Sequence, residues 1–127
     1  MTDVLVVEDD FALSEFIRQS LRQGGVPYRL AQDGQQALGL ADEEWPGVVL
    51  LDLTLPGTLD GWQLWDELLA RSNGRRLRVI LFAAVLDDVD LQQAHLRGTW
   101  AILRKPVTRA RLTQVVREVL GTAALRG

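Results

Sequence analysis

The chain has 127 residues, 47% of them hydrophobic, no cysteine and a formal net charge of −3. These values suit one globular domain and exclude a disordered chain, a disulfide framework and a cysteine-ligated metal, while the acidic balance argues against nucleic-acid binding by this domain. No apolar run approaches the ~20 residues that span a bilayer, and the start does not resemble a signal peptide. We therefore expect a cytoplasmic protein with no membrane partner.

Strand and helix signals alternate five times along the chain. The predicted strands are short apolar runs, and the predicted helices show apolar residues at helical spacing behind capping residues. The strands are expected, in chain order, at Val4–Val7, Pro27–Ala31, Val48–Leu51, Leu77–Phe82 and Trp100–Leu103. The helices are expected at Asp10–Gln23, from Asp33 to about Glu44, after Asp60, from Asp87 or Asp88 to near Gly98, and at about Thr108–Leu120.

Five strand–helix units with short connections predict a doubly wound α/β fold. Such a fold has a five-stranded parallel sheet with helices on both faces. No linker or internal repeat divides the chain, so we expect one domain over residues 1–121 and a frayed C-terminal tail over residues 122–127. The tryptophans are interpreted mainly as packing residues of helices and strands; they are Trp45, Trp62, Trp65 and Trp100.

Charged residues follow three of the predicted strands: Glu8 and Asp9 the first, Asp52 the third and Lys105 the fifth. The carboxyl ends of parallel strands share one edge of the sheet, where open α/β folds place their sites. Carboxylates this close are costly unless they are protonated or bridged by a cation, and their hard oxygens suit Mg²⁺. The alternative is that such aspartates cap helices. Asp10 fits that role, and for Asp52 alone the two interpretations stand equal.

A carboxylate at such an edge can act as a nucleophile toward a phosphoryl group. That chemistry needs a cation to neutralise the phosphoryl oxygens and a donor to orient them. Lys105 offers a compact positive charge on a long stem. The alternative for Lys105 is a solvated surface lysine, although its place between an apolar run and Pro106 favours the site.

Three segments in order resemble the receiver domain of two-component response regulators. They are Leu5–Asp10, Leu51–Pro56 with Asp60 and Gly61, and Arg104–Pro106. Each segment alone is a weak signal, but the three together, on five strand–helix units covering about Asp3–Leu120, are specific. The resemblance implies the flavodoxin-like receiver fold and a role in bacterial two-component signal transduction or a phosphorelay.

The resemblance also assigns roles to the charged residues. It makes Asp52 the phosphoryl acceptor, forming an aspartyl phosphate, with a sensor histidine kinase or phosphotransfer protein as donor and an effector protein as a further partner. Mg²⁺ would be held by Asp9 directly, by Glu8 through water, by Asp52 and by the backbone carbonyl of Thr54. Lys105 would contact the phosphoryl group.

Two positions depart from the family pattern. Ala83 stands where receivers usually have Thr or Ser, and Ile102 stands where they usually have Tyr or Phe, three residues before the lysine. In the family the Thr or Ser hydroxyl forms a hydrogen bond with the phosphoryl group and moves inward. The aromatic ring then turns into the space that the hydroxyl leaves. The acceptor and metal residues are therefore present, but the usual switch is not. The resemblance also implies a cis peptide bond between Lys105 and Pro106.

Other classes with related chemistry fit the sequence less well. A flavodoxin-like electron carrier needs a phosphate-cradling loop after the first strand, where this chain has Glu8, Asp9 and Asp10. A phosphatase of the haloacid dehalogenase type needs a second aspartate where this chain has Thr54. We expect no turnover of an external substrate, and at most self-phosphorylation and autodephosphorylation at Asp52. The remaining alternative is a receiver-like interaction module that works without phosphorylation.

Overall fold

The structure, a computed structural model, describes residues 3–125. Its five strands form one parallel sheet in the order β2-β1-β3-β4-β5. The strands are β1 (Val4–Val7), β2 (Tyr28–Ala31), β3 (Val48–Asp52), β4 (Val79–Ala83) and β5 (Ala101–Arg104). The helices are α1 (Phe11–Gln23), α2 (Gly34–Glu43), α3 (Gly61–Arg71), α4 (Asp88–Leu96) and α5 (Arg109–Leu125).

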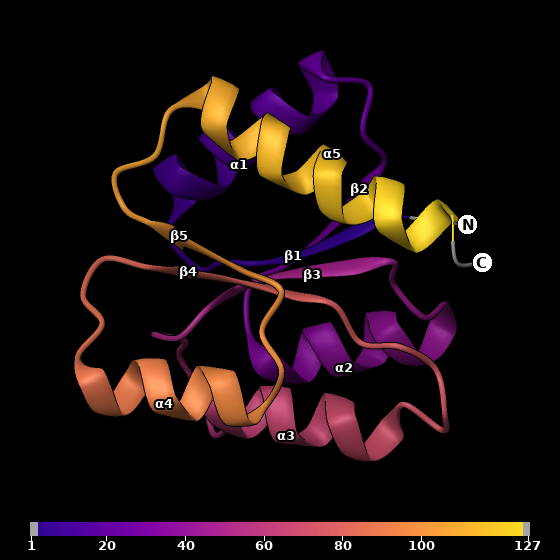
Figure 1. The fold of residues 1–127 in the computed structure, drawn as a ribbon, viewed down its shortest axis with the longest axis vertical. Helices are drawn as coiled ribbons and strands as arrows, with labels where there is room; N and C mark the ends of the chain where they lie inside the picture. Colours follow the sequence, from indigo (N-terminus) through magenta and orange to yellow (C-terminus); the bar gives the residue numbers. More distant parts are fainter. Residues whose placement is uncertain (1–2, 126–127) are drawn as a thin grey trace.

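The helices form two layers, one on each face of the sheet. Figure 1 shows α1 and α5 on one face and α2, α3 and α4 on the other. This arrangement confirms the doubly wound α/β fold predicted from the alternation of strands and helices. Right-handed crossovers join consecutive parallel strands, so the helix of each crossover lies on a face set by the direction in which the chain moves across the sheet. Where the strand order reverses, the helices change to the other face.

The sheet separates two apolar cores, and alternate residues of each central strand enter different ones. In β3, Val48 and Leu50 pack in the cluster beneath α1 and α5, whereas Val49 and Leu51 pack beneath α2 and α3. All five residues of β3 are buried. Burial on both faces explains why the strand is a continuous apolar run in the sequence.

Aspartates cap four of the helices, as their spacing in the sequence predicts. The side chain of Asp10 accepts a hydrogen bond from the backbone N–H of Leu13, with 2.7 Å between the heavy atoms. The helix-cap interpretation of Asp10 is therefore confirmed. The other three capping residues are Asp33, Asp60 and Asp87.

Several boundaries differ from the expected ones by one to five residues, and β5 is shifted by one residue to Ala101–Arg104. The second strand begins at Tyr28, because Pro27 has no N–H for the ladder. The fourth strand begins at Val79 and continues to Ala83, which places residue 83 on the strand. The last helix continues past Leu120 to Leu125, through alanines that favour helix, while residues 126–127 lie outside the described chain.

Burial of the tryptophans varies more than their interpretation as packing residues implies. Trp65 is 1% exposed and belongs to the core, whereas Trp100 is 41% exposed. Trp62 is half-buried and stacks on Trp65, with ring centroids 5.9 Å apart and planes within 4° of parallel. Trp45 is also half-buried, and its indole N–H donates to the carbonyl of Arg76.

A glycine brings the start of α3 against the end of β3. The backbone N–H of Gly61 donates to the carbonyl of Leu53, with a nitrogen–oxygen distance of 3.0 Å. A Cβ atom at Gly61 would lie 2.5 Å from Leu53 Cα and 2.9 Å from the carbonyl oxygen of Asp52. Only glycine fits this approach, which fixes the backbone directly behind Asp52.

Candidate functional site

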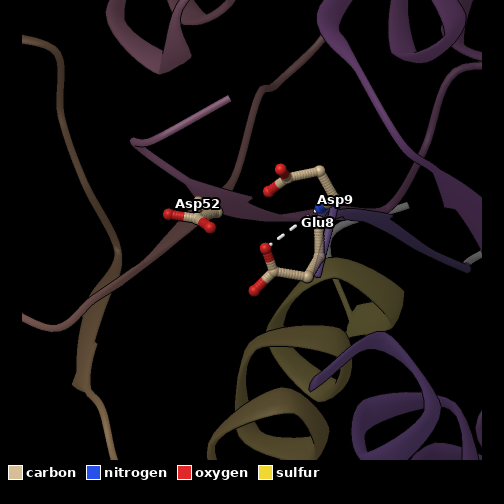
Figure 2. A group of neighbouring side chains, drawn as sticks. All are labelled: Glu8, Asp9 and Asp52. Atoms are coloured by element: carbon tan, nitrogen blue, oxygen red, sulfur yellow. Dashed lines mark hydrogen bonds between the residues drawn. The ribbon is translucent and has the colours of Figure 1, made fainter. Parts of the chain in front are cut away.

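Three carboxylates meet at the carboxyl edge of the sheet, where β1 and β3 end. Val7 pairs with Leu51 in the ladder, so the next residues, Glu8 and Asp52, lie at the same level of adjacent strands. Figure 2 shows the side chains of Glu8 and Asp9 directed toward Asp52. One oxygen from each of the three carboxylates lies within 4.8 Å of the other two. The structure thus brings together the acidic residues that the sequence singled out.

The three carboxylates differ in exposure. Glu8 is 1% exposed and Asp52 is 4% exposed, whereas Asp9 is open to solvent. The backbone N–H of Asp9 donates to Glu8 Oε2 across 3.1 Å. The cluster therefore has a buried side and an open side from which an ion or a phosphoryl group can enter.

Lys105 reaches this cluster from the other side of β4. Its ammonium lies 3.2 Å from Asp52 Oδ2 and 3.3 Å from Glu8 Oε1, and 5.1 Å from the centre of the Phe82 ring. Its backbone N–H donates to the carbonyl of Ala83 across 2.9 Å. The following peptide bond, to Pro106, is cis, as the resemblance implied. Lys105 is thus a bound partner of the carboxylates rather than a solvated surface lysine.

Asp52 is held at both of its carboxylate oxygens. Oδ2 accepts from Lys105, and Oδ1 accepts from the backbone N–H of Thr54 across 3.0 Å. Asp52 caps no helix, because α3 is capped by Asp60 through a reciprocal bond with Gln63. The carboxylate therefore points into the cluster in a fixed orientation.

The electrostatics of the cluster are unfavourable without a further cation. Burial, reinforced by the neighbouring Asp52, raises the pKa of Glu8 to about 8, despite the opposing effect of Lys105. For Lys105, burial opposes the charged form, but the charges of Asp52 and Glu8 outweigh it and raise the pKa of the ammonium. One lysine does not compensate three carboxylates, and the protonated form of Glu8 is favoured as a result.

This donor set fits Mg²⁺. Hard carboxylate oxygens are its preferred protein ligands, and it keeps several waters, for which the open side at Asp9 leaves room. Burial, the largest cause of the raised pKa of Glu8, and the neighbouring Asp52 both disfavour its charged form, which a bound cation would favour. Within residues 3–125, Glu8, Asp9 and Asp52 are the group of acidic or histidine side chains with the spacing to hold a metal ion.

The two atypical positions lie on β4 and β5. Ala83 ends β4, is 5% exposed, and binds Lys105 through its carbonyl. Ile102 lies on β5 opposite Leu81, is half-buried, and packs against the core beneath α2, α3 and α4. Neither side chain carries a group that can hydrogen-bond a phosphoryl oxygen.

Two features of the site were not predicted from the sequence. The N–H of Thr54 orients Asp52, although the sequence suggested only its carbonyl as a ligand. The Phe82 ring lies beneath the Lys105 ammonium. The position of Phe82, one residue before the end of an apolar strand, could have indicated the contact with Lys105. The contact of the Thr54 N–H could not have been predicted, because every residue type except proline has a backbone N–H.

Comparisons with known proteins agree with this geometry. Residues 4–117 match the model of the response regulator receiver domain. The chain is 37% identical over 118 residues to the response regulator MprA of Mycolicibacterium vanbaalenii, an alignment that covers 92% of this chain and 49% of MprA. The chain thus spans about half the length of that relative.

Solved structures share the fold. The receiver domain of NtrX from Brucella abortus is 30% identical, with a TM-score of 0.84 over 94% of this chain and 99% of that one. The chemotaxis protein CheY4 of Vibrio cholerae has a TM-score of 0.85 at 21% identity over 94% of this chain and 98% of that one, a likeness of fold alone.

A five-stranded doubly wound sheet with an acidic cluster and a lysine at its carboxyl edge defines a receiver-type signalling domain. The chain belongs to the response regulator receiver domain family of two-component systems. This membership disfavours the electron-carrier and phosphatase alternatives. No helix within residues 3–125 has the length and apolarity needed to cross a membrane.

Proposed function

We propose that Asp52 accepts a phosphoryl group from a sensor histidine kinase or phosphotransfer protein, with Mg²⁺ bound at the acidic cluster. The observation that carries this proposal is the position of Lys105, 3.2 Å from Asp52 and 3.3 Å from Glu8. A cation beside a buried, oriented carboxylate supplies what phosphoryl transfer to a carboxylate requires.

The proposed transfer is a nucleophilic substitution at phosphorus. An Asp52 carboxylate oxygen forms a bond to the phosphorus of a phosphohistidine, the phosphorus–nitrogen bond breaks, and the imidazole leaves with its electron pair. The product is an acyl phosphate on Asp52. The N–H of Thr54 holds the carboxylate during attack, and Lys105 moves its hydrogen bonds from the carboxylates to the phosphoryl oxygens.

Glu8, Asp9, Asp52 and the backbone carbonyl of Thr54 would hold the Mg²⁺ ion. When bound, the ion supplies positive charge that offsets the carboxylates and the phosphoryl oxygens. Glu8 would release its proton on binding, which couples metal affinity to pH.

The output of this domain would be a protein contact with an effector. Because Ala83 and Ile102 cannot form the hydroxyl and aromatic switch of the family, we propose that phosphorylation biases the conformation of this chain only weakly. The same proposal assigns the chain to the cytoplasm and limits its own catalysis to self-phosphorylation and autodephosphorylation at Asp52. The interaction module without phosphorylation is the less favoured alternative, because the acceptor, the lysine and the acidic pair are all present.

Intact-mass measurement with a small phosphodonor tests the proposal. The wild-type chain with Mg²⁺ should gain one phosphoryl group, about 80 Da. Asp52→Asn should abolish the gain. Asp10→Asn is the matched control, since asparagine also caps α1 and residue 10 lies beside the cluster but outside it. A gain that persists in Asp52→Asn would refute the assignment of Asp52, and no gain in the wild type would favour the interaction module.

A further inference from the structure

Helix α4 is held less firmly by apolar packing than the other helices whose side chains the structure describes. Ala94 is its only buried residue, and Leu91 is half-buried. By contrast α3 buries Leu64, Trp65 and Leu68 among others. Elements with few buried apolar contacts open at a lower free-energy cost than the core.

Two large apolar side chains of α4 are exposed rather than packed against the core. Val89 is 63% exposed and Leu96 is 74% exposed. Apolar residues thus lie on the outer side of α4 as well as the inner side. An ordinary surface helix buries one apolar stripe, which fixes its rotation about its own axis. Helix α4 buries almost no such stripe.

One polar contact ties the C-terminal end of α4 to α3. Arg97, which caps α4, donates from Nε to Asp66 Oδ1 across 2.8 Å and from Nη2 to Asp66 Oδ2 across 3.1 Å. A two-point contact of this kind is directional and stronger than a single ion pair. Nη1 donates to Gln93 Oε1 across 2.8 Å, which holds the arginine against its own helix.

The face of the same guanidinium lies on an aromatic ring. Its central carbon is 4.9 Å from the centre of the Trp62 ring, and Trp62 stacks on the buried Trp65. The Arg97 side chain is only 17% exposed, whereas the Arg71 side chain in an ion pair between α2 and α3 is 39% exposed. Arg97 is therefore packed against Trp62, which stacks on the buried Trp65, while its carboxylate partner Asp66 is 58% exposed.

We propose that Arg97, Asp66 and Trp62 form a latch that holds α4 against α3, and that opening this latch is the principal conformational transition of α4. The latch lies at the end of α4 far from Asp52, which sits at the carboxyl edge of the sheet. Its opening is governed by the contacts of Arg97 with Asp66 and Trp62. The proposal does not depend on phosphorylation, because the latch is closed in the unphosphorylated chain.

Amide hydrogen exchange of the full, unphosphorylated chain tests the latch. Arg97→Ala should speed exchange within residues 88–96 about tenfold, a change of about 1.4 kcal/mol in the opening equilibrium, while α1 and α5 stay unchanged. Asp66→Asn, a milder change at an exposed residue, should act in the same direction. Tryptophan fluorescence should shift in Arg97→Ala, since Trp62 loses its cation.

Arg71→Ala is the matched control. Arg71 also ends a helix and joins it to a neighbour, but its ion pairs are with Asp42 on α2 and Glu67 on α3. It should leave exchange in α4 unchanged. Unchanged exchange in α4 of Arg97→Ala would overturn the proposal. Equal acceleration in every helix would also overturn it, because Arg97 would then stabilise the whole fold rather than latch one element.

Discussion

Lys105 Nζ lies 3.2 Å from Asp52 Oδ2, although β4 separates β3, which ends at Asp52, from β5, which Lys105 follows. The long lysine stem crosses the end of β4 above the Phe82 ring. This reach joins three strands of the sheet at one point, and it makes the lysine the main counter-charge of the buried carboxylates when no metal is bound.

Replacing Lys105 by alanine should destabilise the metal-free protein. Asp52 would lose its charged partner while remaining buried, which costs about 2 kcal/mol for a pair that is partly open to solvent. Urea unfolding at neutral pH measures this loss. Lys105→Arg keeps the positive charge and should recover most of the stability. An alanine variant as stable as the wild type would mean that the ion pair contributes nothing.

Mg²⁺ should raise the melting temperature of the wild-type chain. An ion that binds only the folded state at ~10 times its dissociation constant adds about 1.4 kcal/mol, or about 5 °C for a domain of this size. Asp9→Asn should remove most of this increase at little cost to the metal-free protein, because Asp9 is exposed. An increase that survives in Asp9→Asn would place the ion elsewhere.

Stability of the metal-free protein should fall as pH rises from about 4.5 to about 8. Folded Glu8 keeps its proton until about pH 8, whereas the unfolded chain releases it near the ordinary value of 4.5. Between these values the folded state binds more protons, so rising pH favours unfolding. The stability that the raised pKa provides is complete below 4.5 and lost above 8.

Urea unfolding across that pH range measures how the free energy of unfolding changes with pH, and the Glu8→Gln variant is the comparison. Glutamine carries no titrating proton, so its stability should change less with pH. Magnesium affinity of the wild type should rise over the same range, because binding displaces the Glu8 proton. A glutamine variant with the wild-type slope would assign the effect to other groups.

A phosphoryl mimic bound at Asp52 should perturb backbone amides near Asp52 and Lys105, with little change in α4 or around Ile102. Ala83 offers no hydroxyl, and a neutral hydrogen bond of that kind is worth on the order of 1 kcal/mol, or roughly fivefold in the conformational equilibrium. Ala83→Thr combined with Ile102→Tyr should extend the perturbations to α4 and β5. Two-dimensional NMR follows both. Large distant shifts in the wild type would show that the missing groups are dispensable.

Gly61→Ala should destabilise the protein by about 1–3 kcal/mol. The added methyl would meet the backbone of Leu53 at 2.5 Å, and backbone cannot move aside as a flexible side chain can. Gly39→Ala is the matched control within α2, where nothing lies within 4 Å of the new methyl; it should stabilise by about 0.5–1 kcal/mol. Thermal or urea unfolding measures both, and equal effects would contradict the packing argument.

The sequence predicts the fold well because its central strands are buried on both faces. Runs such as Val48–Leu51 can be interpreted in only one way once helical segments alternate with them. The grouping of Glu8, Asp9 and Asp52 follows from the same logic, since each stands at the end of a strand. Parallel topology alone brings such residues together.

Other features depend on distances that no sequence pattern encodes. The contact of Arg97 with Asp66 joins residues 31 positions apart, on helices whose relative placement is set by the whole fold. The N–H of Thr54 that orients Asp52 belongs to the backbone, so its residue type gives no signal. The extension of α5 past Gly121 reflects local helix propensity that outweighs one glycine.

The alternation of β3 between two cores restricts how this chain can change in length. Inserting or deleting one residue within β3 would exchange the sides of Val49 and Leu51 with those of Val48 and Leu50. Each core would then receive side chains shaped for the other, and the residue at the strand end would turn away from Lys105. Viable insertions and deletions should therefore be confined to loops, such as residues 56–58, which are exposed.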